Sequence, residues 1–236
     1  DEPELEHGED VGPYVGVALF LLLLWLVIAF TKMPKASDEE NAVDFGAAFR
    51  RLIKKRHYVW AVIAQFFYVG AQIGVWSFTI RYVMKELQLN EEQPASYYLA
   101  ALVLFLAFRF ICTFLMRFIS PRHLLSALAG LAMVLTLIVI TGGGYVGVYA
   151  LVSISACMSL MFPTIYGLGL RDLGEDTKIG GSGLIMAILG GAVLTGVQGK
   201  ISDVTGSINL AFFVPLICFG IIIYFALKEA KELKSV

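Results

Sequence analysis

Charged residues are scarce in this chain. Asp, Glu, Lys and Arg make up 16% of its 236 residues, against roughly a quarter in an ordinary soluble domain. The formal net charge is -1, so the sequence also lacks the basic excess that is typical of nucleic-acid-binding proteins. Hydrophobic residues take up 58% of the chain instead. This balance predicts a membrane protein and no nucleic acid partner.

Cysteine and histidine are also rare. The cysteines, Cys112, Cys157 and Cys218, all lie inside apolar runs, where they are small core residues rather than a disulfide framework. The histidines lie at or outside the ends of these runs and lack the spacing of metal ligands. A phosphate-binding loop and a nucleophile elbow are missing too. We therefore expect no metal, no cofactor and no enzyme activity.

Long apolar runs dominate what is present. Each has about 20 residues, enough at 1.5 Å per residue to cross a hydrocarbon core of roughly 30 Å. The predicted spans lie at 12–31, 58–80, 95–116, 124–141, 145–169, 180–200 and 208–227. The sequence therefore predicts an all-α, polytopic membrane protein with about seven transmembrane helices embedded in a lipid bilayer.

The basic residues mark one side of the membrane. The longest connection, 32–57, opens acidic and closes with a basic amphipathic segment that predicts an interfacial helix. Lys and Arg favour cytoplasmic loops, and most of those in this chain fall in this linker or in loops on the same side. We therefore expect the linker and the tail 228–236 to be cytoplasmic and the acidic segment 1–11 to be non-cytoplasmic, in a bacterial inner membrane.

One helix, a long linker and six closely connected helices are unusual for a complete protein. Major facilitator transporters have two six-helix halves joined by a long cytoplasmic loop. On that template 12–31 is helix six, 32–57 is the central loop and 58–227 is the C-terminal six-helix bundle. The chain begins with Asp1, and we expect a fragment or a processed product whose partner is the N-terminal half. A complete subunit that does not itself transport is the alternative.

Three stretches resemble one transporter family. They are AQFFYVGAQIGVWSFTIRY at 64–82, MSLMFPTIYGLGLRDLGEDTKIGGSGLIM at 158–186 and GGAVLTGVQGKISDVTG at 190–206. Their order and spacing resemble helices seven to eleven of the fucose:proton symporter family, the fucose, galactose and glucose branch of the major facilitator superfamily. The resemblance implies proton-coupled uptake of L-fucose or a related hexose by alternating access. The L-fucose pattern has a tyrosine where this chain has Phe162, so a glucose, galactose or other hexose symporter is the alternative.

The span 58–80 carries the main candidates for a sugar site. Its residues Gln65, Tyr68, Gln72 and Trp76 recur at steps of three and four and lie within about 80° of one another on a helix. A glutamine amide that faced lipid would leave its polar groups unsatisfied. Sugars need amide donors and acceptors for their hydroxyls and aromatic rings for their C–H faces. The stripe is therefore a predicted sugar site, with hydrogen bonds between helices as the alternative.

The span 145–169 offers a second wall for the same site. Ser159, Phe162 and Tyr166 share one helical face. Pro163 has no N–H to donate to the carbonyl of Ser159, which favours a kink beside a cavity. A proline tolerated within an aromatic core is the alternative.

Small residues predict where helices approach closely. Gly70 and Gly74 lie on the face of their span opposite the glutamines. Gly191 follows Gly183 and Ala187 at steps of four in the span 180–200. Such stripes favour close helix packing.

Only one charged side chain lies well inside a span. Arg109 is either a functional intramembrane charge or an anchor whose stem reaches the cytoplasmic interface. Arg81 and Asp203 end two spans on the other side, where we expect them to form a gate when the carrier faces inward. No predicted span has an interior Asp, Glu or His. A proton-coupled carrier would therefore keep its titrating groups in the missing N-terminal half.

Overall fold

The computed structural model describes residues 11–31, 45–89 and 93–232. The predicted acidic segment 1–11, apart from Val11, therefore lies outside the described residues, as do the first half of the linker, 32–44, and the end of the tail, 233–236. The chain forms two compact units, Asp1–Val43 and Asp44–Val236, and each is considered by itself.

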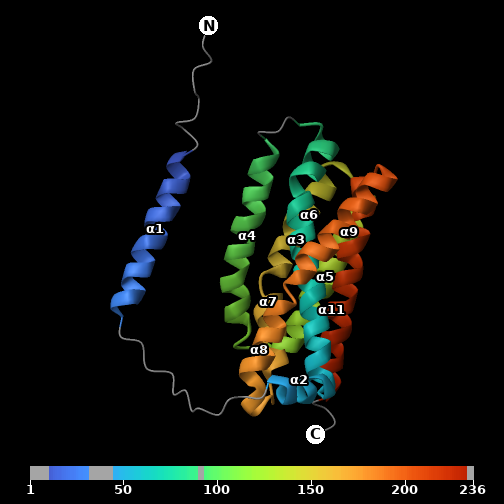
Figure 1. Cartoon of the computed structure of the whole chain (residues 1–236). Helices are drawn as coiled ribbons and strands as arrows, with labels where there is room; N and C mark the ends of the chain where they lie inside the picture. The colour runs from blue at the N-terminus through green and yellow to red at the C-terminus, as the bar shows by residue number, and fades with distance from the viewer. Residues whose placement is uncertain (1–10, 32–44, 90–92, 233–236) are drawn as a thin grey trace. The chain divides into compact units, whose positions relative to one another are not determined.

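The first unit contains the helix α1 (Val11–Phe30), which is drawn in blue in Figure 1. It corresponds to the predicted span 12–31. The helix has no charged residue, and large side chains such as Trp25 and Phe30 are exposed along it. A helix that is apolar on every side is typical of a membrane span.

The second unit is a helical bundle. Its described elements are α2 (Phe45–Lys54), α3 (Arg56–Leu87), α4 (Pro94–Leu115), α5 (Pro121–Thr141), α6 (Gly144–Met158), α7 (Met161–Leu170), the 3₁₀ turn η1 (Gly174–Asp176), α8 (Thr177–Met186), α9 (Leu189–Thr205), α10 (Ile208–Ala211) and α11 (Phe213–Glu232). They make 6 segments long and apolar enough to cross a membrane. These segments overlap the six predicted spans that follow the linker, and the all-α polytopic fold is confirmed.

Local sequence explains where the helices begin and end. Pro94 and Pro121 are the first residues of α4 and α5, positions at which a missing N–H costs no helical hydrogen bond. Gly206 ends α9 with a φ of 64°, a left-handed conformation that glycine adopts without strain. Three of the six segments are interrupted, between α6 and α7, between α8 and α9, and between α10 and α11.

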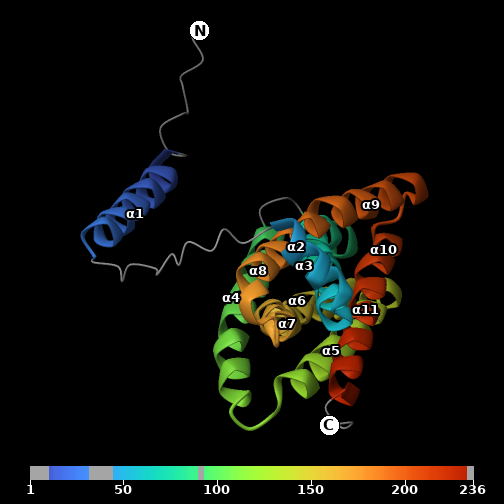
Figure 2. The ribbon, with the colours of Figure 1, turned by 60° about the horizontal axis from the view of Figure 1, so that its bottom comes forward.

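The helix α3 lies at the centre of the bundle. It packs against α4, α6, α7, α9 and α11, and Figures 1 and 2 show these helices around it. It is 32 residues long and extends to Leu87, beyond the predicted end at residue 80. The side chains of α3 therefore reach most of the bundle.

Glycines bring α3 and α9 into close contact. A Cβ at Gly70 would collide with Leu194, and one at Gly74 would collide with the amide of Gln198. On the other helix, a Cβ at Gly190 of α9 would collide with the backbone carbonyl oxygen of Phe66 on α3. Gly191 likewise faces Ile73 on α3. The two backbones approach each other because both helices present glycines at the crossing.

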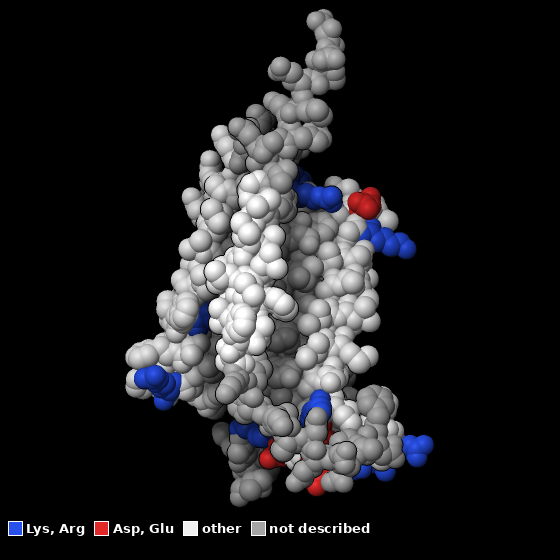
Figure 3. Space-filling view, turned by 60° about the vertical axis from the view of Figure 1, so that its left-hand side comes forward, with Lys and Arg blue, Asp and Glu red and all other residues white. Residues whose placement is uncertain are grey.

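Most of the charged side chains that Figure 3 shows for the bundle lie near its two ends. At the end where α2 lies, Arg51 donates two hydrogen bonds to the carboxylate of Asp176, at 3.0 and 2.6 Å. At the opposite end, Glu86 accepts hydrogen bonds from the backbone N–H of Gly144 and the amide of Asn209, at 2.7 and 2.9 Å. This arrangement suits a bundle whose middle is surrounded by lipid.

The close approach of α3 and α9 yields a first prediction. Gly190→Ala places a methyl group against the Phe66 carbonyl, so the two backbones must separate. Overpacking of this kind costs about 1–3 kcal/mol. We expect the purified variant in detergent to unfold several degrees below the parent chain in a thermal scan.

Gly196→Ala is the matched control, because Gly196 lies on the same helix and an added methyl group there would meet nothing within 4 Å. It shares the change in helix propensity but not the collision. Equal unfolding temperatures for the two variants would contradict the proposed tight crossing.

Candidate functional site

The polar and aromatic stripe of α3 divides into a buried part and a half-buried part. Gln65 and Tyr68 are each 0% exposed. Gln72 and Trp76, one and two turns further along the helix, keep part of their surface accessible. The stripe therefore runs from the interior of the bundle towards an accessible surface.

The broken segment α6/α7 lies beside this stripe. The helix α6 ends at Met158 and α7 begins at Met161. The hydroxyl of Tyr68 donates a hydrogen bond to the carbonyl of Met158 at 3.0 Å. The indole N–H of Trp76 donates to the hydroxyl of Ser155 at 3.2 Å. Two side chains of α3 thus hold the end of α6.

Arg109 completes the hydrogen bonding at this break. Pro163 has no N–H, so the carbonyl of Ser159 loses its helical donor. The guanidinium Nη1 of Arg109, on α4, donates to this carbonyl at 3.2 Å. Ser159 itself is 0% exposed, and an unpaired carbonyl there would cost free energy. The intramembrane arginine therefore contacts the broken helix, a role that neither of the two sequence interpretations included.

Aromatic rings surround the break. The ring of Phe162 lies 6.1 Å from that of Tyr68 in an edge contact and stacks on that of Tyr166 at 6.3 Å. On the other side, Trp76 makes an edge contact of 5.2 Å with Phe105 of α4. Phe162 and Tyr166 are both partly accessible. The site thus offers ring faces and edges from α3, α4 and α7.

Two buried glutamines have amides without a hydrogen-bond partner among the described residues. They are Gln65 on α3 and Gln198 on α9, each 0% exposed. Leaving such an amide unpaired costs about 1–3 kcal/mol. Gln198 lies against Gly74, so its amide belongs to the α3–α9 contact. Gln65 lies on the same face of α3 as Tyr68 and Gln72. Its amide adds a donor and an acceptor to this face, deeper in the bundle than the half-buried residues.

The other predicted residues lie elsewhere. Gly70, Gly74 and Gly191 belong to the α3–α9 crossing. Arg81 is exposed, with its guanidinium 6.0 Å from the ring centre of Phe78. Asp203 is also exposed, and the two charged residues, both of which the structure describes, form no ion pair with each other. The gate between them stays a prediction for an inward-facing carrier.

The sequence interpretation missed Ser155 and Phe105, which both contact Trp76. A signal for each was present. Ser155 precedes Ser159 by one turn, and Phe105 precedes Arg109 by one turn, so each lies on the same face as a residue that was singled out. Spacing alone does not show which of several faces turns towards α3.

The chemistry of these side chains is that of binding. The part of the chain that the structure describes holds no group of three His, Cys, Asp or Glu side chains able to hold a metal ion. Besides the guanidinium of Arg109, which donates to the Ser159 carbonyl, it brings together amides, hydroxyls and aromatic rings. Such groups bind a neutral ligand that has both hydroxyl groups and apolar C–H faces.

The contact between Arg109 and Ser159 yields a second prediction. Arg109→Ala leaves a buried carbonyl unpaired and should lower the free energy of unfolding by about 1–3 kcal/mol. Pro163→Ala restores an N–H at the position that serves this carbonyl in a regular helix. In thermal unfolding of the purified chain, we expect the double variant Arg109→Ala/Pro163→Ala to be more stable than Arg109→Ala alone.

Arg117→Ala is the control, because Arg117 is an exposed cation just after the same helix whose guanidinium lies over the ring of Phe114. Pro163→Ala should not alter the effect of Arg117→Ala. Additive effects of Arg109→Ala and Pro163→Ala would contradict a shared carbonyl, because uncoupled sites add within a few tenths of a kcal/mol.

Comparisons with known proteins agree with this geometry. No family model matches the chain. It is 42% identical over 220 residues to the L-fucose-proton symporter of Escherichia coli, a match that covers 91% of this chain and 50% of the relative. It is 33% identical over 224 residues to a putative glucose/galactose transporter of Helicobacter pylori, covering 93% of this chain and 54% of the relative. The chain thus spans about half the length of these relatives.

Solved structures agree with the sequence relatives. The fold matches a crystal structure of the fucose:proton symporter of Escherichia coli with a TM-score of 0.83 and 40% identity. The match covers 92% of this chain and 54% of the other. A structure of a major facilitator transporter in the outward conformation matches equally well, with a TM-score of 0.83. The chain therefore belongs to the fucose:proton symporter family of the major facilitator superfamily.

Proposed function

We propose that this chain is about half of a secondary active transporter that takes up L-fucose or a related hexose together with protons. The observation that carries the proposal is the 42% identity over 220 residues to a protein named L-fucose-proton symporter. The site supports it, because amides and aromatic rings meet beside a broken helix. Broken helices of this kind are where secondary transporters bind their substrates.

The exposure of the side chains suggests how the predicted sugar residues divide their roles. Gln72, Trp76, Phe162 and Tyr166 are partly accessible, and we assign them the contacts with the monosaccharide. Tyr68 is fully buried, and its hydroxyl already donates a hydrogen bond to the Met158 carbonyl. Together with the buried Gln65, it would support the site rather than contact the sugar.

The arrangement in the membrane is also part of the proposal. We assign α1 to helix six of the full carrier, the residues 32–57 to the central loop and α3 to α11 to the C-terminal half. The basic residues favour a cytoplasmic loop and a cytoplasmic C-terminus, across a bacterial inner membrane. The N-terminal half would cover the accessible face of α3, where Ile73 and Ile80 are exposed, and would carry the carboxylates that bind protons.

The identity of the transported sugar has one alternative. Relatives named glucose/galactose transporter are 33% identical in Helicobacter pylori and 32% identical in Brucella abortus. Phe162 has no hydroxyl with which to bond a sugar. Both observations favour glucose or galactose as the alternative to L-fucose.

Proton coupling gives a third prediction. Reconstituted alone in vesicles, the chain should cause no sugar-dependent proton uptake, because the described spans lack a titrating carboxylate at mid-membrane. The same chain joined to its upstream residues should make the medium alkaline when L-fucose, glucose or galactose is added. Clear alkalinisation by the chain alone would contradict its assignment as half of a carrier.

The sugar site gives a fourth prediction, measured as sugar affinity of the complete carrier. Gln72→Ala removes a hydrogen bond of about 0.5–1.5 kcal/mol and should weaken binding roughly two- to twelve-fold. Trp76→Ala removes the stacking surface and should cost at least as much. Expression and insertion should stay normal, because neither side chain is fully buried.

Ile80→Ala is the matched control, an exposed residue one turn beyond Trp76 on the same helix. It should leave the affinity unchanged. Normal affinity in both Gln72→Ala and Trp76→Ala would remove α3 from the sugar site, and an equal loss of protein level in both would make the stripe structural.

A further inference from the structure

The short helix α2 lies at one end of the bundle, against α3 and α8. It is strongly amphipathic. Ala48 and Leu52 are buried against the bundle, 0% and 1% exposed. Ile53, next to Leu52, is 54% exposed. The exposed cations Arg50 and Lys54 form a further side of the helix, adjacent to the side of Ile53. A helix with a buried stripe, an exposed apolar flank and a basic flank is typical of a membrane surface.

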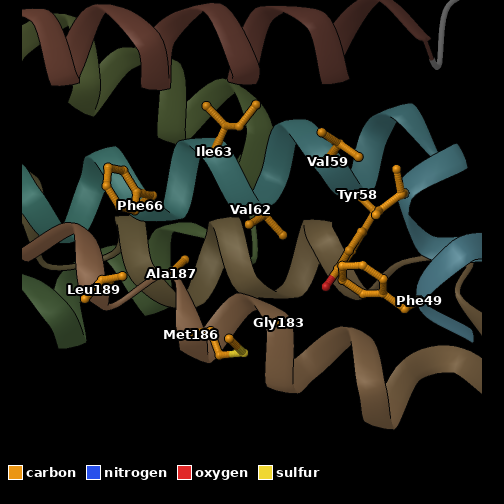
Figure 4. A pocket seen from close by; sticks show the side chains of 11 residues that line it. Phe49, Tyr58, Val59, Val62, Ile63, Phe66, Gly183, Met186, Ala187 and Leu189 are labelled. Carbon is orange, nitrogen blue, oxygen red and sulfur yellow. The ribbon is translucent and has the colours of Figure 1, made fainter. Parts of the chain in front are cut away.

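A hollow of about 390 Å³ opens beside the apolar flank of α2. Ile53 of α2, Val62 and Phe66 of α3, and Met186 of α8 are among the side chains that line it. Figure 4 shows Tyr58 and Val62 of α3 pointing towards α8, with Phe49 of α2 beside Tyr58.

The hollow has no polar group to offer a sugar. Its one hydroxyl, that of Tyr58, is already engaged, because it donates to the carbonyl of Gly180 at 3.0 Å. The remaining lining residues are apolar or glycine. The hollow therefore suits a hydrocarbon chain.

The charge next to the hollow is positive. Arg50 and Lys54 follow the lining residues Phe49 and Ile53 directly in sequence and are exposed. Neither forms an ion pair with any other residue that the structure describes. Arg51, by contrast, is bonded to Asp176. Two cations beside an apolar hollow are complementary to a negatively charged headgroup with a hydrocarbon tail.

We propose that α2, α3 and α8 form a binding site for an anionic phospholipid. One acyl chain fills the hollow, and the phosphate group lies against Arg50 and Lys54. The site is separate from the sugar residues and requires no transport activity. Bound lipid fixes α2, and with it the Arg51–Asp176 contact, at the end of α3.

Native mass spectrometry of the purified chain tests whether the site prefers a negatively charged headgroup. In detergent with equal amounts of phosphatidylglycerol and phosphatidylcholine carrying the same acyl chains, we expect phosphatidylglycerol to be retained preferentially. Arg50→Gln/Lys54→Gln should weaken this preference on the order of 30-fold, since each surface cation contributes about five-fold. The control Arg117→Gln/Lys178→Gln removes two exposed cations that, unlike Arg50 and Lys54, are not adjacent in sequence to a lining residue, and it should keep the preference. An equal loss in both variants, or no preference in the parent chain, would overturn the proposal.

Photocrosslinking tests whether an acyl chain occupies the hollow. A phosphatidylglycerol with a photoreactive group in its acyl chain should label peptides from residues 58–66 and 183–189, and unlabelled phosphatidylglycerol should compete. Met186→Trp narrows the hollow at a side chain that is 76% exposed, so the fold is kept and labelling should fall several-fold. Even labelling of all helices would overturn the proposal. So would absence of labelling in the complete carrier, since another helix would then fill the hollow.

Discussion

The core of a membrane holds no water, so the backbone there must find hydrogen-bond partners within the protein. The break between α6 and α7, one turn before Pro163, depends on how this chain meets that requirement. The break frees carbonyls at Met158 and Ser159. Tyr68 and Arg109, from two different helices, donate to them at 3.0 and 3.2 Å. The same contacts gather α3, α4, α6 and α7 around one place. The irregular backbone and the candidate sugar site therefore have a common origin.

Much of the fold could be predicted because its signals are local. A run of about 20 apolar residues forms a span whatever surrounds it, and Pro163 interrupts a helix through its own covalent structure. The amphipathic segment that closes the linker appears as α2. The end of α11 depends on a contact that is not local. Its apolar run predicts a tail from residue 228, whereas Glu229 lies within α11, is 1% exposed and pairs with Arg171 at 3.3 Å. A partner from another part of the chain allows the burial of this carboxylate.

The composition of the site depends on contacts that no local pattern specifies. Four residues of α3 share a face, yet Gln65 and Tyr68 are buried while Gln72 and Trp76 are partly accessible, because different neighbours lie along the helix. Arg109 bonds a carbonyl 50 residues away in sequence. Its partner is set by the rotation of α4 about its axis, which hydropathy does not determine. The spacing identified candidate residues, and the packing of the helices assigns them different roles.

The central claim is that a sugar binds between the accessible part of α3 and the broken segment α6/α7. A structure of the complete carrier with a bound hexose tests it most directly. The account predicts a sugar within hydrogen-bond distance of the Gln72 amide and with a C–H face on an aromatic ring from Trp76, Phe162 or Tyr166. A sugar that contacts none of these four side chains would contradict it.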